Sequence, residues 1–248
     1  MIIDIHVKLG PSFDNKGKSV EDYIVQMEEN NITYAMLCPN KPKNYSLDDA
    51  NNYILQVINR YSDKFFGAYR VGPWNWDSSK DKLKAFFGMQ DKYKFMYLNP
   101  WEDNYRINDA VMHPIFEYAG GNNIPILIET GYPFVSHITQ IGEVAQKYGG
   151  VKFIVTNAGQ LDLSGFTLAD VNYQLSFHKN IYLVTSPAVG AEWLANMITN
   201  TAEGRVVFGS SYPFCDVYME KYRITNSYVD DAHKKDVFYK NASKLIYN

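Results

Sequence analysis

Polar and apolar residues alternate along the first stretch of the chain, from Ile2 to Gly10. Every second position from Ile3 to Leu9 is apolar, and Asp4, His6 and Lys8 lie between them. Successive side chains of a β-strand point to opposite faces, so the three polar residues are expected on one face of a strand. Strands of a parallel barrel are usually apolar throughout, and polar residues toward the C-terminal end of one indicate the mouth of a barrel. The alternative is an edge strand with one face in water.

Apolar runs alternate with helical periods along the rest of the chain. Strands are predicted at residues 2–10, 33–38, 65–71, 94–98, 124–129, 151–156, 180–184 and 205–209. Helices are predicted at residues 19–29, 46–61, 80–89, 108–118, 135–148, within 167–178, at 188–199, from 216 onward and at 231–247, with Ser19 and Ser46 as N-caps of the first two. Strands that alternate with helices pair in parallel through right-handed crossovers. The sequence therefore predicts an α/β fold, a (βα)8 TIM barrel, as a single domain over residues 1–248.

Length and composition agree with one such barrel. The chain has 248 residues, close to the typical size of about 250 for this fold, and 46% of them are hydrophobic. A net charge of −3 and dispersed lysines argue against nucleic acid as a partner. No apolar run approaches the roughly 18 residues of a membrane span, and Asp4 near the start argues against a secretory signal, so we expect a cytoplasmic protein with no membrane partner. Cys38 and Cys215 are expected to be unpaired thiols.

The C-terminal ends of the strands carry the chemistry in a barrel of this kind. These ends hold polar or reactive side chains, namely His6, Lys8, Cys38, Arg70, Asn99, Glu129, Asn157, Ser186, Ser210 and Ser211. Aromatic residues that follow several of them are expected to rim the opening, namely Trp74, Trp76, Trp101, Tyr132 and Tyr212. Such a mouth suits a flat or aromatic small molecule. Alternatively, the rings only cover the barrel or form a contact in a homo-oligomer. Among the other histidines, His137 is the one expected near the mouth.

Six short segments carry a resemblance that spans the chain. They are Asp4-Ile-His6-Val-Lys8, Leu98-Asn99-Pro100, Ile126-Leu-Ile-Glu129-Thr-Gly131, Phe153-Ile-Val-Thr-Asn157-Ala-Gly159, Phe208-Gly-Ser-Ser211-Tyr-Pro213 and Lys240-Asn-Ala-Ser-Lys-Leu-Ile246. In that order they resemble the Asp-x-His-x-His, Leu-His-Pro, His-Thr-Gly, His-x-Gly, Phe-Gly-Ser-Asp-Tyr-Pro and Asn-Ala-x-x-Leu-Phe motifs of the amidohydrolase-related family. That family comprises metal-dependent barrel hydrolases and includes carboxymuconate-semialdehyde decarboxylase-like enzymes.

The departures from these motifs fall on the metal site that the resemblance implies. In the family, histidines of strands one, five and six and an aspartate of strand eight form the metal and catalytic cluster. Only His6 matches, and the other positions hold Lys8, Glu129, Asn157 and Ser211. A lysine ammonium has no lone pair, and Asn and Ser are poor zinc ligands. We therefore expect a degenerate site with no resident metal or other cofactor, in which His6 and Glu129 alone would hold a divalent ion only weakly.

The residues at these positions are candidates for catalysis and for substrate binding. The catalytic candidates are His6, Lys8 and Glu129, and the substrate-binding candidates are Arg70, Asn99, Asn157, Ser211, Trp74 and Tyr132. An ion pair between Lys8 and Glu129 is predicted in place of the metal cluster, because a positive and a negative side chain face each other across the mouth.

Four functions are compatible with this pattern. The first is binding of a small anionic or aromatic molecule without turnover. The second is a metal-independent hydrolase or lactonase in which Glu129 or His6 is the general base and Lys8 polarises the carbonyl; loss of the strand-eight aspartate counts against it. The third is Schiff-base chemistry at Lys8, which a neighbouring Glu129 disfavours by stabilising the ammonium. The fourth is a structural role without catalysis.

Overall fold

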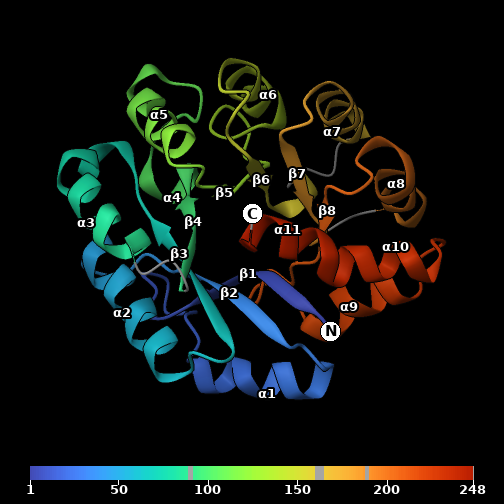
Figure 1. Cartoon of the computed structure of the whole chain (residues 1–248), viewed down its shortest axis with the longest axis horizontal. Helices are drawn as coiled ribbons and strands as arrows, with labels where there is room; N and C mark the ends of the chain where they lie inside the picture. The colour runs from blue at the N-terminus through green and yellow to red at the C-terminus, as the bar shows by residue number, and fades with distance from the viewer. Residues whose placement is uncertain (89–91, 160–164, 188–189, 248) are drawn as a thin grey trace.

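Eight parallel strands form the centre of the molecule, as the sequence predicts (Figure 1). The computed structural model describes residues 1–88, 92–159, 165–187 and 190–247. The strands follow one another in chain order, and each pairs in parallel with the next. Their bounds are β1 (Ile3–Leu9), β2 (Tyr34–Pro39), β3 (Phe65–Arg70), β4 (Tyr93–Leu98), β5 (Ile126–Ile128), β6 (Phe153–Val155), β7 (Ile181–Val184) and β8 (Val206–Val207).

Backbone contacts beyond β8 bring the end of the sheet back to β1. The amide of Ile5 donates to the carbonyl of Phe208 over 3.1 Å, and the amide of Lys8 donates to the carbonyl of Tyr212 over 2.8 Å. The segment that follows β8 therefore lies beside the polar end of β1. This contact places Ser211 next to His6.

Helices surround the strands and cover their outer faces (Figure 1). Their bounds are α1 (Val20–Asn30), α2 (Leu47–Arg60), α3 (Trp76–Gly88), α4 (Pro100–Asp103), α5 (His113–Gly121), α6 (Ile138–Lys147), α7 (Gly165–Phe177), α8 (Ala191–Asn196), α9 (Val217–Thr225), α10 (Asp231–Lys235) and α11 (Asn241–Tyr247). Ser19 and Ser46 cap α1 and α2, which confirms both expected N-caps. Helix α3 begins at Trp76 instead of residue 80, and the four-residue α4 was not expected. No helix among the described residues is long and apolar enough to cross a membrane.

The C-terminal helix α11 closes the bottom of the barrel. Ala242, Leu245 and Ile246 join one buried cluster with residues of the strands, including Ile3 and Ile5 of β1. Figure 1 shows α11 across the middle of the ring of strands. The barrel interior is thus apolar at this end, and His6 and Lys8 of β1 lie at the other.

A bulge in β1 corrects one sequence prediction, because Asp4 does not share a face with His6 and Lys8. Between Asp4 and Val7 the pairing with β2 advances three residues on β1 and two on β2, from Ala35 to Leu37. Ile5 lies in the barrel interior, whereas Val7 packs in the outer cluster with residues of α1. Asp4 lies on that outer side as well, and the hydroxyl of Tyr23 in α1 donates to its carboxylate over 2.8 Å. The extra residue turns His6 and Lys8 toward the mouth.

Candidate active site

A cavity of about 300 Å³ opens at the C-terminal ends of the strands. Its lining combines charged, hydroxyl and thiol groups with aromatic rings. The lining residues are His6, Lys8, Phe13, Asp14, Trp101, Glu102, Glu129, Tyr132, Asn157, Pro187, Ser211, Phe214 and Cys215. Six of the residues predicted for the site, His6, Lys8, Glu129, Asn157, Ser211 and Tyr132, therefore meet around one cavity.

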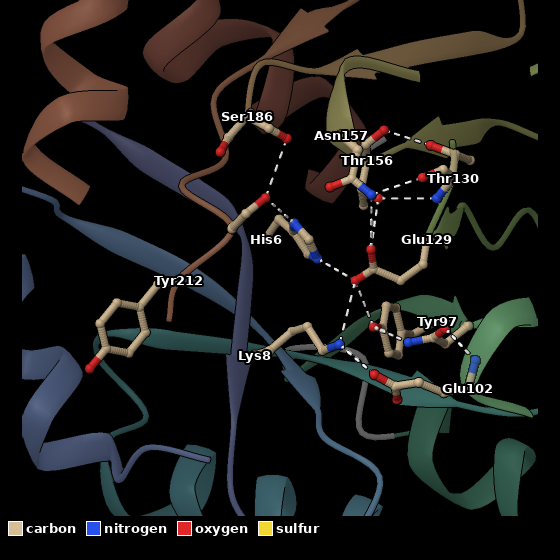
Figure 2. A network of polar contacts seen from close by, with 12 residues as sticks. His6, Lys8, Tyr97, Glu102, Glu129, Thr130, Thr156, Asn157, Ser186 and Tyr212 are labelled. Atoms are coloured by element: carbon tan, nitrogen blue, oxygen red, sulfur yellow. Dashed lines mark hydrogen bonds and ion pairs between the residues drawn. The ribbon is translucent and has the colours of Figure 1, made fainter. Parts of the chain in front are cut away.

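The imidazole of His6 links a hydroxyl to a carboxylate. Its Nδ1 lies 2.9 Å from Oγ of Ser211, and its Nε2 lies 2.8 Å from Oε1 of Glu129. All three residues are at least 95% buried, with exposed fractions of 2% for His6, 3% for Ser211 and 5% for Glu129. We call Ser211, His6 and Glu129 the hydrogen-bond chain. Figure 2 shows the ring of His6 pointing at the carboxylate of Glu129.

Glu129 is ionised and fully engaged. Its Oε1 also accepts from the hydroxyl of Tyr97 over 2.8 Å, and its Oε2 accepts from Thr156 over 2.9 Å and from Asn157 over 3.5 Å. Burial alone would raise the pKa of Glu129, but the neighbouring His6 and Lys8 and these hydrogen bonds hold it well below its ordinary value. In the tautomer that carries its proton on Nε2, His6 donates to the carboxylate of Glu129, and its Nδ1 accepts from the hydroxyl of Ser211.

Lys8 makes its closest ion pair with Glu102. Its Nζ lies 2.9 Å from Oε1 of Glu102 and 3.9 Å from Oε1 of Glu129, so the predicted pair with Glu129 is present as the longer of two contacts. The ammonium also lies 5.0 Å from the centroid of the Phe214 ring. Burial alone would raise the pKa of Glu102, but Lys8 and Arg70 lower it overall.

Glu102 was missed by the sequence reading, although a local signal points to its position. Asn99 accepts the amide of Glu102 over 3.1 Å and caps α4, with Pro100 at the first helical position. An Asn-Pro-x-Glu pattern of this kind is typical of a helix start. It follows β4 directly, so it carries the carboxylate to the mouth.

Arg70 lies outside the cavity lining and forms an ion pair with Glu102. Its guanidinium is fully buried and contacts Asp103 over 3.0 Å and Glu102 over 2.8 Å. Burial disfavours the charged guanidinium, but Asp103 and Glu102 raise the pKa of Arg70 overall. We call Lys8, Glu102, Arg70 and Asp103 the ion-pair cluster. Arg70 itself does not line the cavity, and it contacts Glu102, which does.

The remaining predicted positions divide into lining and supporting residues. Trp101 and Tyr132 stack with centroids 5.1 Å apart and an interplanar angle of 3°, and both line the cavity. Trp74 lies outside the lining, 68% exposed, with its indole N–H donating to the carbonyl of Asp103. Asn99 is buried and serves as the cap of α4. Tyr212 points away from His6 and packs on Tyr23, with centroids 5.1 Å apart (Figure 2).

The other aromatic, histidine and cysteine candidates have local explanations. Trp76 packs edge-on against Tyr118, with centroids 5.5 Å apart, instead of reaching the rim. His137 is the N-cap of α6 and lies outside the cavity lining. Cys38 is a buried free thiol, whereas Cys215 is a partly buried free thiol that lines the cavity.

Comparison with known families identifies the fold's relatives. A family model described as Amidohydrolase matches residues 46–246. The chain belongs to this amidohydrolase family. No curated protein matches the chain.

Solved structures share the barrel of this amidohydrolase-family chain at low sequence identity. 5-Carboxyvanillate decarboxylase from Sphingomonas paucimobilis is 13% identical, with a TM-score of 0.79 over 99% of this chain and 98% of that one. 2,6-Dihydroxybenzoate decarboxylase from Rhizobium is 10% identical, with a TM-score of 0.76 over the same shares of 99% and 98%. 4-Oxalomesaconate hydratase from Rhodopseudomonas palustris is 16% identical, with a TM-score of 0.74 over 99% and 95%. These similarities establish the fold.

The donor set of this amidohydrolase-family chain does not fit the metal cluster expected of the family. No group of three or more His, Cys, Asp or Glu side chains suited to a metal is found among the described residues. Both ring nitrogens of His6 are already engaged, and the oxygens of Glu129 accept from four groups. An ammonium at 3.9 Å, Lys8, also opposes a cation beside Glu129. We therefore derive no catalytic step through a metal.

Proposed function

We propose that this amidohydrolase-family barrel is a metal-independent hydrolase of small, uncharged aromatic esters or lactones. The observation that carries the proposal is the contact of 2.8 Å between His6 and the ionised Glu129, which leaves the other ring nitrogen of His6 at the cavity as a base. A general base needs to lie within hydrogen-bond reach of the proton it accepts, and a carboxylate behind it stabilises the imidazolium that forms. The contact between His6 and Glu129 therefore favours a hydrolase over a protein that binds a ligand without turnover.

His6, and not Glu129, is the base in this proposal. The two carboxylate oxygens of Glu129 share four hydrogen-bond donors. A carboxylate with so low a pKa is a weak proton acceptor at neutral pH. Glu129 therefore acts on His6, fixing the ring and its tautomer, while Nδ1 takes the proton of the attacking hydroxyl group.

Lys8 supplies the positive charge for the carbonyl oxygen of the substrate. It is the one lysine or arginine among the described residues that line the cavity. Glu102 holds Nζ of Lys8, and Lys8 as a whole is only 4% exposed. The charge is therefore fixed in place before the substrate binds. Fixed charges in a site from which water is excluded stabilise a developing oxyanion without reorganisation.

The lining favours a substrate that is aromatic and uncharged. Trp101 and Tyr132 offer a stacked pair of rings, with Phe13 and Phe214 as further apolar walls. The volume of about 300 Å³ suits a small ligand. Three carboxylates, those of Asp14, Glu102 and Glu129, line this space. They outnumber the one ammonium there, so a negatively charged substrate would be repelled. Two structural neighbours are named as decarboxylases of aromatic acids; the aromatic walls agree with such ligands, and the charge balance argues for the neutral ester.

Hydrolysis of phenyl acetate and dihydrocoumarin in excess chelator tests the proposal. We expect turnover that persists without metal and falls by about 100-fold or more in His6→Asn, the usual contribution of a general base. His113→Asn, at a histidine outside the cavity lining, is the matched control and should retain wild-type rates. Loss of activity on chelation that zinc or manganese restores would contradict the proposal. A thermal shift with these compounds but no turnover would favour binding alone.

A further inference from the structure

We propose that Ser211 is the nucleophile of this reaction, so that hydrolysis passes through an acyl group on Ser211 and water attacks only in the second half. The inference rests on the proposed function, which leaves open what His6 deprotonates. It follows from what lies against Nδ1 of His6, the ring nitrogen that Glu129 does not contact. That group is the hydroxyl of Ser211, 2.9 Å from Nδ1.

The contacts order the three side chains as nucleophile, base and carboxylate. Glu129 holds Nε2 of His6 over 2.8 Å, and the ring presents Nδ1 to the hydroxyl. The same logic of hydroxyl, imidazole and carboxylate operates in serine hydrolases, where the two ring nitrogens have the exchanged roles. A second acceptor for the hydroxyl, the carbonyl of Ser186, is more distant at 3.3 Å. Nδ1 of His6 is therefore the nearer of two acceptors for the hydroxyl proton of Ser211.

The backbone at Ser211 is held in a conformation that serine rarely adopts. Its φ is 56°, in the left-handed region, where a side chain costs energy. Two hydrogen bonds fix the turn: the amide of Ser210 donates to Asp4 over 2.9 Å, and the amide of Tyr212 donates to Oγ of Ser210 over 3.1 Å. Strained turns of this type after a strand present the nucleophilic serine in other hydrolases.

Gly209 allows this turn to lie close to His6. A Cβ at Gly209 would sit 2.5 Å from Cγ1 of Val184 and 3.0 Å from Cβ of His6, so a larger residue would push the strand end away. The approach of the segment 209–211 to β1 is thus built into the packing. It brings the hydroxyl within reach of the base at the cavity wall.

The reaction balances with these groups and water alone. Oγ of Ser211 bonds to the ester carbonyl carbon while its proton passes to Nδ1 of His6, and the carbonyl oxygen takes the negative charge near Lys8. The bond to the leaving alkoxy oxygen then breaks, and that oxygen receives the proton from Nδ1. Water next adds to the acyl carbon and gives a proton to Nδ1. The bond from the acyl carbon to Oγ breaks, and Ser211 regains its proton as the acid leaves.

Cys215 is the other candidate nucleophile in the lining. Burial raises the pKa of its thiol above the ordinary value, which lowers the fraction of reactive thiolate. The acceptor nitrogen of His6 is already bonded to Ser211. Ser211 is therefore the favoured nucleophile, and Cys215→Ala serves as a control.

A fluorophosphonate probe and a p-nitrophenyl ester test the inference on the full chain. We expect mass spectrometry to find the phosphonyl adduct on Ser211, and stopped-flow absorbance to show a burst of about one p-nitrophenol per chain. Ser211→Ala should lose the adduct, the burst and at least about 1,000-fold of turnover. Cys215→Ala should still carry the adduct on Ser211, and Ser176→Ala, at an exposed serine of α7, should keep both the adduct and the burst. Ser211→Gly, which fits the left-handed backbone, is the second variant should the alanine variant not fold.

The outcomes separate this inference from the proposed function. Metal-independent turnover that survives in Ser211→Ala and Ser211→Gly within a few-fold, without a burst, would overturn Ser211 as nucleophile and leave His6 as the base for water. A His6-dependent adduct on Ser211 without ester turnover would support the nucleophile and overturn the ester substrate. Neither adduct nor turnover in the wild-type chain would overturn both.

Discussion

Two sides of the same cavity are built on different principles. The ion-pair cluster of Lys8, Glu102, Arg70 and Asp103 is saturated, since Arg70 contacts both carboxylates and Lys8 contacts Glu102 over 2.9 Å. The hydrogen-bond chain is directional: Glu129 binds one end of His6, and the other end faces a hydroxyl at the cavity. The first arrangement fixes charges in place, and the second has a proton that can move.

This difference separates stability from activity. Removing one partner of a buried ion pair leaves an unpaired charge and destabilises the fold. Removing one member of a proton-transfer chain mainly raises the barrier of the reaction. Variants of Arg70 and of Glu129 should therefore report different quantities, whereas Lys8, which pairs with Glu102 and also lines the cavity, belongs to both sides.

The largest effect is expected for Glu129→Gln. A glutamine places an amide N–H or a neutral oxygen against Nε2 of His6, so the ring can turn its proton to Nδ1, where it blocks the proton of Ser211. We expect turnover to fall by about 1,000-fold, or about 4 kcal/mol of barrier, as for a wrong tautomer in a catalytic triad. The rate with phenyl acetate measures it, and Glu143→Gln, at an exposed carboxylate on α6, is the control. A loss below ten-fold would remove Glu129 from the mechanism.

Arg70→Met is expected to cost about 3–5 kcal/mol of unfolding free energy, because Glu102 and Asp103 lose their buried partner. The matched control is Arg60→Met, whose exposed guanidinium pairs with Glu21 over 3.0 Å. Exposed pairs contribute less than about 1 kcal/mol. Urea unfolding of both variants makes the comparison. Equal losses for the two would show that the ion-pair cluster does not stabilise the mouth.

Acid should lower the stability of the fold through two carboxylates of the cavity, Glu102 and Glu129. The pKa values of Glu102 and Glu129 are lowered in the folded chain, so their ionised forms contribute stability above their unfolded pKa near 4.5, and this contribution is lost as the pH falls below it. We expect the urea midpoint to hold between pH 7 and 5 and to fall on further acidification. Glu102→Gln should show a flatter fall than Glu143→Gln. The opposite order would contradict the lowered pKa of Glu102.

The sequence predicted the barrel because its signals are local. Strands such as β5 and β6 are apolar runs, and helices α2 and α6 show a clear 3.6-residue period. Ser19 and Ser46 supply capping side chains to α1 and α2. Helix α4 was not predicted, because a helix of four residues is too short to show a hydrophobic period. The family resemblance likewise depended on short segments in order, and the match over residues 46–246 confirms it.

The site was predicted in part, because contacts at the mouth depend on register. Alternation placed Asp4 beside His6, but one extra residue opposite β2 moved it to the side of α1. No pattern in the first strand announces that bulge. The pairing of Lys8 with Glu102 depends on α4, and the contact of Ser211 with His6 depends on the return of the chain after β8.

The smallest effect, at Ser211 itself, has an unusual sign. In most positions alanine is more stable than glycine by about 0.5–1 kcal/mol, because glycine loses more backbone freedom on folding. At a φ of 56° the order should reverse, since glycine has no Cβ to strain, and Ser211→Gly should be about 1 kcal/mol more stable than Ser211→Ala. Urea unfolding of this pair, and of Ser176→Gly against Ser176→Ala within α7, measures the reversal. Both Ser211 variants lack the hydroxyl, so both should be inactive. A glycine variant that is more stable but inactive would show that the backbone at residue 211 is strained in the active protein. An alanine variant as stable as the glycine one would mean that the turn stores no strain.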